Sequence, residues 1–125
     1  YVPFIQHAYK SGIDVGNATN GWEFEEEKIE QVLPYLKWVR FTVGAGTPES
    51  YSKIMFKSKD HTEVFERAMK NIRYAVKFKE KNNLDVTLGI QMVLTPESFW
   101  FTTVRAFSSN RSNTSSWLLN SEDFT

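Results

Sequence analysis

Segments with the period of a helix alternate with segments of strand-like composition over the first hundred residues. Three strand-like segments lie between turn signals, at 13–18, 37–43 and 86–94. Segments with helical period precede and separate them, at 4–10, 25–33 and 62–81. This alternation is typical of consecutive βα units around a parallel sheet. The sequence therefore predicts an α/β fold.

Several helix ends carry capping signals. Gly12 is placed to end the first helix, and Thr47 is the expected N-cap of a short helix that begins at a proline. Asp60 with Glu63 predicts a capping-box start for the helix over 62–81. These signals fix the element boundaries that we expect.

Side chains alternate between the two faces of a strand, so each face has its own composition. One face of each strand is apolar, with Ile13, Val15, Val39, Phe41, Val43, Val86, Leu88, Ile90, Met92 and Leu94. The other face is mostly small, polar or charged, with Asp14, Gly16, Ala18, Asn20, Arg40, Thr42, Gly44, Asp85, Thr87, Gly89, Gln91 and Val93. Parallel sheets are usually covered by helices on both faces. The pattern favours a barrel-like sheet whose inner face lines a ligand-holding lumen, and a one-sided sheet facing solvent is the alternative.

In barrels of βα units the functional residues lie at the carboxyl ends of the strands. The candidates at these ends are Asn17, Thr19, Asn20, Thr42, Gly44, Gly46, Gln91, Val93 and Thr95. They include neither a lysine base nor a carboxylate pair, which argues against an aldolase-like barrel enzyme.

The composition changes near Trp100. Residues 101–125 are rich in Ser, Thr and Asn, contain no lysine, and show neither helical nor strand periodicity. We expect about three βα units over residues 1–100 and an irregular tail over 101–125.

The composition also excludes several classes of function. The 15 basic and 15 acidic side chains balance, so the chain has no electrostatic signature of nucleic-acid or membrane-surface binding. The absence of cysteine excludes a disulfide, a thiol nucleophile and any cysteine-held metal centre on this chain. No apolar run approaches the roughly 20 residues that span a bilayer. His7 and His61 lack ligand-spaced neighbours, and we expect both at the surface, with no metal-ligating and no catalytic residue on the chain.

Three segments carry a resemblance to a known family. They are Ile13–Gly21 (IDVGNATNG), Trp38–Tyr51 (WVRFTVGAGTPESY) and Leu84–Glu97 (LDVTLGIQMVLTPE). In order and spacing they resemble the third, fourth and fifth strands of radical S-adenosylmethionine (radical SAM) enzymes. The resemblance covers about residues 4–99 and stops at the tail, which does not follow the family pattern.

The resemblance implies a partial (β/α)6 barrel, TIM-barrel-like, with an open polar lumen. It also implies a cytoplasmic enzyme that cleaves S-adenosyl-L-methionine reductively and abstracts hydrogen from a small-molecule or peptide substrate. In the family a 4Fe-4S iron–sulfur cluster is held by three cysteines, usually CxxxCxxC, which this chain lacks. We therefore expect an internal fragment that supplies part of the cofactor and substrate wall and is inactive alone. A non-catalytic α/β binding or scaffold module is the alternative.

The resemblance assigns roles to individual positions. Thr42 stands where the family usually has a serine, which implies a hydrogen bond to the cofactor ribose. The other positions implied to bind the cofactor are Gly44, Asn20, Gln91 and Val93, and Arg40 is implied to bind a substrate carboxylate.

Each of these positions also has a structural interpretation. Arg40 could form an ion pair with Asp14 or Asp85, and Thr42 could simply favour a strand. Gly44 could serve only the loop, and Asn20 could serve only a turn.

Overall fold

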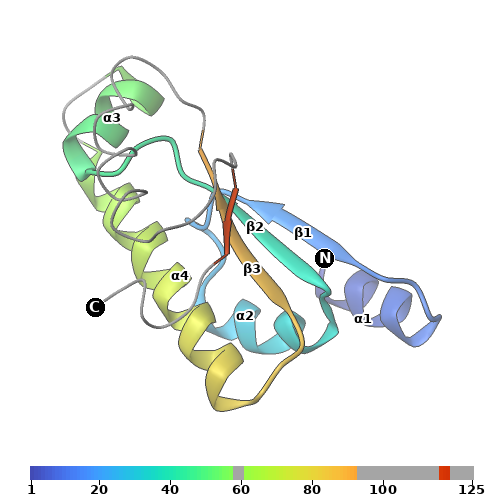
Figure 1. Cartoon of the computed structure of the whole chain (residues 1–125). Helices are drawn as coiled ribbons and strands as arrows, with labels where there is room; N and C mark the ends of the chain where they lie inside the picture. Colours follow the sequence, from blue (N-terminus) through green and yellow to red (C-terminus); the bar gives the residue numbers. More distant parts are fainter. Residues whose placement is uncertain (58–60, 93–115, 119–125) are drawn as a thin grey trace.

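The computed structural model of the 125-residue chain describes residues 1–57, 61–92 and 116–118. In chain order the elements are α1 (Val2–Lys10), β1 (Gly16–Thr19), α2 (Glu26–Val32), the 3-10 helix η1 (Leu33–Tyr35), β2 (Trp38–Thr42), α3 (Pro48–Phe56), α4 (Thr62–Lys81), β3 (Thr87–Gln91) and β4 (Ser116–Leu118) (Figure 1). Strands that alternate with helices confirm the predicted α/β class. Among the described residues, no helix is long and apolar enough to cross a membrane.

The four strands form one sheet in the order β1-β2-β3-β4. The first three strands are parallel, and Trp38 pairs with Gly16 on one side and Thr87 on the other. β4 pairs antiparallel with β3, in a segment where we expected irregular structure. For these three residues that expectation is wrong, because the edge of β3 offers N–H and C=O groups to any extended segment beside it, whatever its side-chain period.

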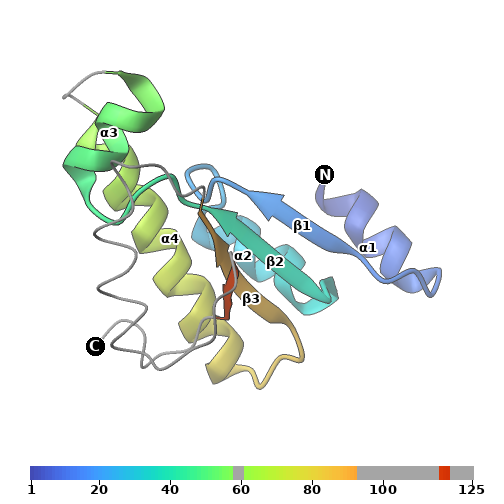
Figure 2. The same ribbon diagram turned by 45° about the horizontal axis from the view of Figure 1, so that its top comes forward.

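The helices cover one face of this sheet (Figures 1 and 2). A single buried cluster joins Val39 and Leu88 of the strands to Ile29 of α2 and Ile72 of α4. Each fully buried side chain of this size contributes about 1.5–3 kcal/mol. α4 has the predicted bounds, and one stripe of its apolar residues is buried, with Phe65, Ala68, Ile72, Ala75 and Val76. α3 lies at the end of the molecule toward which the strands run.

The first strand begins later than predicted. Gly12 has a φ of +77°, and the N–H of Ile13 donates to the carbonyl oxygen of Ala8 at 3.0 Å. These two residues complete the C-terminal cap of α1. Ile13 is therefore 58% exposed rather than a buried strand residue, and β1 starts at Gly16.

The helix starts agree with the sequence signals only in part. The hydroxyl oxygen of Thr47 accepts a hydrogen bond from the N–H of Ser50 at 3.2 Å, which confirms the predicted cap of α3. The N-cap of α4 is His61, whose side chain makes no capping hydrogen bond, and Asp60 lies outside the described residues. His61 is partly buried and stacks on Phe56, with ring centres 4.3 Å apart, so it is less exposed than its predicted surface position implies. The sequence did not predict this contact, because Phe56 lies five residues before His61 and this spacing belongs to no helical or strand period.

Candidate functional site

The sheet has a second face, opposite the helices, which we call the polar face. Its residues follow from the pairing of the strands and are Gly16, Ala18, Trp38, Arg40, Thr42, Thr87, Gly89 and Gln91. Paired residues on neighbouring strands point to the same side of a sheet. The predicted site residues Arg40, Thr42 and Gln91 are thus brought together on this face, with Thr42 directly beside Gln91.

Arg40 is exposed and lies between two small neighbours, Ala18 on β1 and Gly89 on β3. Within the described ranges no carboxylate forms an ion pair with Arg40, so the structural interpretation with Asp14 or Asp85 is not supported there. A guanidinium offers five N–H donors in a planar fork that suits a carboxylate. Arg40 can therefore bind an anionic ligand on the polar face.

The sequence argument missed Trp38, which is 43% exposed on the same face. The guanidinium carbon of Arg40 lies 5.9 Å from the centre of the Trp38 ring, within the range of a cation–π contact. The sequence could have predicted this contact, because residues 38 and 40 are two apart and therefore share a face of the strand. The pair gives the polar face one aromatic and one cationic surface.

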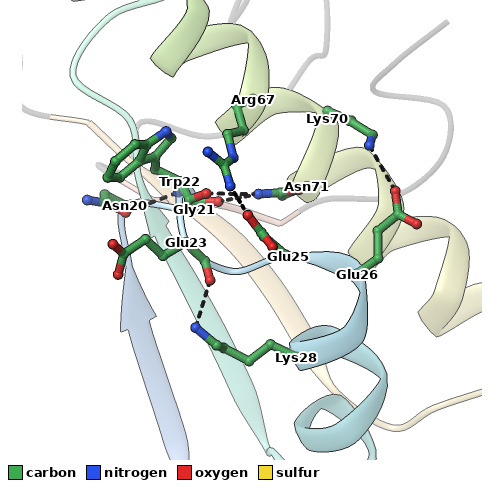
Figure 3. A network of polar contacts seen from close by, with 10 residues as sticks. All are labelled: Asn20, Gly21, Trp22, Glu23, Glu25, Glu26, Lys28, Arg67, Lys70 and Asn71. Carbon is green, nitrogen blue, oxygen red and sulfur yellow. Dashed lines mark hydrogen bonds and ion pairs between the residues drawn. The ribbon is translucent and has the colours of Figure 1, made fainter.

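The turn after β1 is built from its own side chains (Figure 3). The N–H of Gly21 donates to the hydroxyl oxygen of Thr19, and the N–H of Trp22 donates to the side-chain carbonyl of Asn20, both at 3.1 Å. Gly21 has a φ of +80°, which favours glycine. Asn20 thus serves the turn with its oxygen and leaves its amide nitrogen for other contacts.

Two other candidates from this strand lie elsewhere. Asn17 and Thr19 belong to β1 itself and pair with Val39 and Phe41, so they point to the side that the helices cover. A hydrogen bond also links Asn17 to the hydroxyl of Tyr1. The structure therefore separates these two residues from the polar face.

Asn71 on α4 is a second residue that the sequence argument missed, and it binds the turn after β1 through hydrogen bonds. The side-chain amide of Asn71 on α4 donates to the carbonyl oxygens of Gly21 at 2.8 Å and Trp22 at 3.2 Å. Asn71 is 3% exposed. Its burial could have been predicted, because it lies three residues after Ala68 and four before Ala75, on the apolar stripe of α4. A buried amide needs a hydrogen-bond partner.

Charged side chains surround the same turn on the helix side (Figure 3). Arg67 forms an ion pair with Glu25 and lies over the Trp22 ring at 5.4 Å, and Lys70 pairs with Glu26 at 3.1 Å. An open pocket of about 490 Å³ lies beside them and is lined by Val2, Trp22, Glu23, Glu25, Glu27, Lys28, Gln31 and Arg67. Exposed ion pairs of this kind contribute about 0–1 kcal/mol, so this network fastens the loop only weakly.

The loop after β2 is shaped by packing. A Cβ on Gly44 would lie 2.6 Å from the sulfur of Met55 on α3, so the glycine leaves room for this partly exposed side chain at the end of the strand. Gln91 accepts a backbone hydrogen bond from Val43 at 3.0 Å, which extends the pairing beyond β2. Val93 and Thr95 lie outside the described residues.

The perturbed tyrosines lie away from the polar face. Burial raises the pKa of Tyr51 on α3, and burial also raises that of Tyr1, which a hydrogen bond to Asn17 partly offsets. A hydrogen bond to Glu30, together with burial and nearby negative charge, raises the pKa of Tyr74 to about 12. Tyr74 thus bonds α4 to Glu30 of α2, and none of the three tyrosines is among the residues of the polar face.

Comparison with known proteins gives no family assignment: no family model matches the chain, and no curated protein matches it. Within the described ranges no group of three His, Asp or Glu side chains is arranged to hold a metal ion.

Proposed function

We propose that this chain forms part of a radical SAM enzyme, and that its polar face is part of the wall that contacts S-adenosylmethionine and substrate. The observation that carries the proposal is the order of the strands. The three segments that resemble the family form neighbouring parallel strands in sequence order, with the helices on the opposite face. A sheet of this kind is the repeating wall of a βα barrel, whose uncovered face turns toward the lumen.

The residues of the polar face suit S-adenosylmethionine. The resemblance implies that Arg40 binds a substrate carboxylate, and its guanidinium equally suits the carboxylate in the amino-acid part of S-adenosylmethionine. The Thr42 hydroxyl and the Gln91 amide, on paired positions, can exchange hydrogen bonds with ribose hydroxyls. When bound beside a cluster, S-adenosylmethionine supplies one-electron chemistry, to which the protein adds binding and orientation.

The chain does not suit the cluster itself, because it has no cysteine. In this proposal the cluster ligands belong to another part of the parent protein. We expect the purified chain, incubated anaerobically with iron and sulfide, to develop no charge-transfer absorbance of a 4Fe-4S cluster and to leave S-adenosylmethionine uncleaved under a strong reductant. Stoichiometric cluster assembly or reductive cleavage would contradict the fragment interpretation.

Equilibrium binding of S-adenosylmethionine to the chain tests the role of the polar face. Arg40→Gln removes an exposed cation from this face, and Arg67→Gln makes the same change on the helix side. A charge-assisted hydrogen bond contributes about 1.5–3 kcal/mol, so Arg40→Gln is expected to weaken binding roughly 10- to 100-fold. Arg67→Gln is expected to leave the affinity within about twofold.

A second ligand separates the carboxylate contact from the rest of the site. Adenosine has the ribose and the base but no carboxylate, so Arg40→Gln is expected to leave its affinity unchanged. Equal losses for Arg40→Gln and Arg67→Gln, or no binding of S-adenosylmethionine by the unmodified chain, would contradict the proposal. Binding of an unrelated small anion with the same dependence on Arg40 would favour the non-catalytic binding module.

A further inference from the structure

Asn71 connects two βα units that are distant in sequence. It lies on α4, which precedes β3, and its two hydrogen bonds reach the turn after β1, about fifty residues earlier in the chain. The turn already satisfies the N–H groups of Gly21 and Trp22 through its own side chains. Asn71 supplies donors to the carbonyl oxygens of the same two residues, so both sides of the turn are bonded.

The turn also packs directly on α4. A Cβ on Gly21 would lie 3.4 Å from the Phe41 ring and 3.6 Å from Ala68, which are ordinary contact distances, so the turn backbone packs beside both side chains. α4 is itself fixed to the sheet, because Ile72, beside Asn71, and Ala75 are fully buried in the core. The position of the turn is therefore set by a rigid helix rather than by the loop alone.

We propose that Asn71 is a positioning residue for the polar face. By holding the carbonyl oxygens of Gly21 and Trp22, it fixes the preceding residue, Asn20, at the carboxyl end of β1. The side-chain amide nitrogen of Asn20, which the turn does not use, then faces a ligand beside Thr42 and Gln91. This proposal rests on the proposed function, because it assigns Asn71 to the same ligand site.

The neighbouring contacts of α4 do not explain this arrangement. Arg67 and Lys70 also reach the loop, but their side chains are 48% and 71% exposed, and exposed ion pairs fix a loop weakly. Asn71 is buried, and a buried carbonyl that loses its donor is strongly disfavoured.

The test compares Asn71→Ala with Ile72→Val in the full chain. Ile72→Val is the control because it loosens the core at the next position without touching the turn. Temperatures are chosen so that both variants are folded to the same extent. The readouts are the backbone amide resonances of residues 19–22 without ligand, and the affinity for S-adenosylmethionine.

For Asn71→Ala we expect shifted or broadened resonances for Gly21 and Trp22. We also expect affinity about fivefold or more below that of Ile72→Val, the ratio for one lost hydrogen bond. Unchanged turn resonances would overturn the positioning role. A perturbed turn with the affinity of the control would overturn the link to the ligand while leaving the proposed function in place.

Two further outcomes are decisive. If the unmodified chain does not bind S-adenosylmethionine, the proposed function fails and this role fails with it. If Asn71→Ala does not fold, Asn71→Ser replaces it in the test. The serine keeps one hydroxyl donor. We therefore expect turn resonances and an affinity that lie between those of the unmodified chain or Ile72→Val and those of a chain whose turn is detached from α4. One hydroxyl cannot replace both hydrogen bonds of the Asn71 amide, so an Asn71→Ser variant with the turn resonances and affinity of the unmodified chain would overturn the proposal.

Discussion

The indole of Trp38 lies over Gly16 of the neighbouring strand, in the space that a side chain at position 16 would need. The Arg40 guanidinium approaches the same ring from two residues further along β2. The amino end of the polar face is therefore an aromatic surface shared by two strands, and the carboxyl end carries the polar candidates.

Replacing Gly16 with alanine is expected to displace the Trp38 ring. The new Cβ overlaps the indole, and overpacking of this kind costs about 1–3 kcal/mol, at the low end here because the ring is partly exposed. In a Trp38→Ala background the clash is absent, and Gly16→Ala is expected to be neutral or stabilising by up to about 1 kcal/mol. Denaturant unfolding of the four proteins in a double-mutant cycle measures the coupling. Additive effects would show that the ring does not occupy this space.

Thr42→Val tests the hydroxyl of the candidate cofactor contact. The change keeps the shape of the side chain and suits a strand, so the stability of the fold is expected to change by less than about 1 kcal/mol. One neutral hydrogen bond contributes about 0.5–1.5 kcal/mol, so S-adenosylmethionine is expected to bind about 2- to 10-fold more weakly. Thr87→Val, on the same face at the amino end of β3, is the matched control and is expected to bind normally. Equal affinities of the two variants would remove Thr42 from the site.

Tyr74 and Glu30 predict a pH dependence of stability at the α2–α4 contact. The hydrogen bond to Glu30 raises the pKa of Tyr74 from 10.0 to about 12, so the folded state favours the protonated phenol. The stabilisation is complete below about pH 10 and is lost as the pH rises through about 12. Burial also raises the pKa values of Tyr1 and Tyr51, but an absorbance titration is expected to show one tyrosine that ionises near pH 12, and Tyr74→Phe is expected to remove that transition. Glu30→Gln is the control that should shift this ionisation to lower pH. If Tyr74→Phe removes a tyrosine that ionises at an ordinary pH and leaves the late ionisation in place, the raised pKa does not belong to Tyr74.

The sequence was sufficient for the fold class and for most of the core. Strict alternation in β2 placed Val39 and Phe41 in the core and Arg40 on the other side, because one covered face leaves a clear period of two. The helical stripe of α4 was equally clear. β1 was harder to delimit, because Ile13 is apolar but is used to complete the cap of α1.

The arrangement of the candidate site was predictable only for residues that lie on strands. Arg40, Thr42 and Gln91 follow from alternation and parallel pairing. The roles of Gly44 against Met55 and of Asn71 against Gly21 depend on which helix lies beside which loop, and no local pattern contains that information. The pairing of β4 was also unpredictable from local sequence, because this short strand is defined by its pairing with the edge of β3.

Mapping S-adenosylmethionine binding on the ¹⁵N-labelled full chain tests the central claim most directly, namely that the polar face is the ligand-binding side. The account predicts concentration-dependent shifts at the amides of Asn20, Arg40, Thr42 and Gln91. It predicts none at Lys70 and Lys77, on the exposed side of α4. Shifts confined to α2 and α4, or no shifts at high ligand concentration, would contradict it.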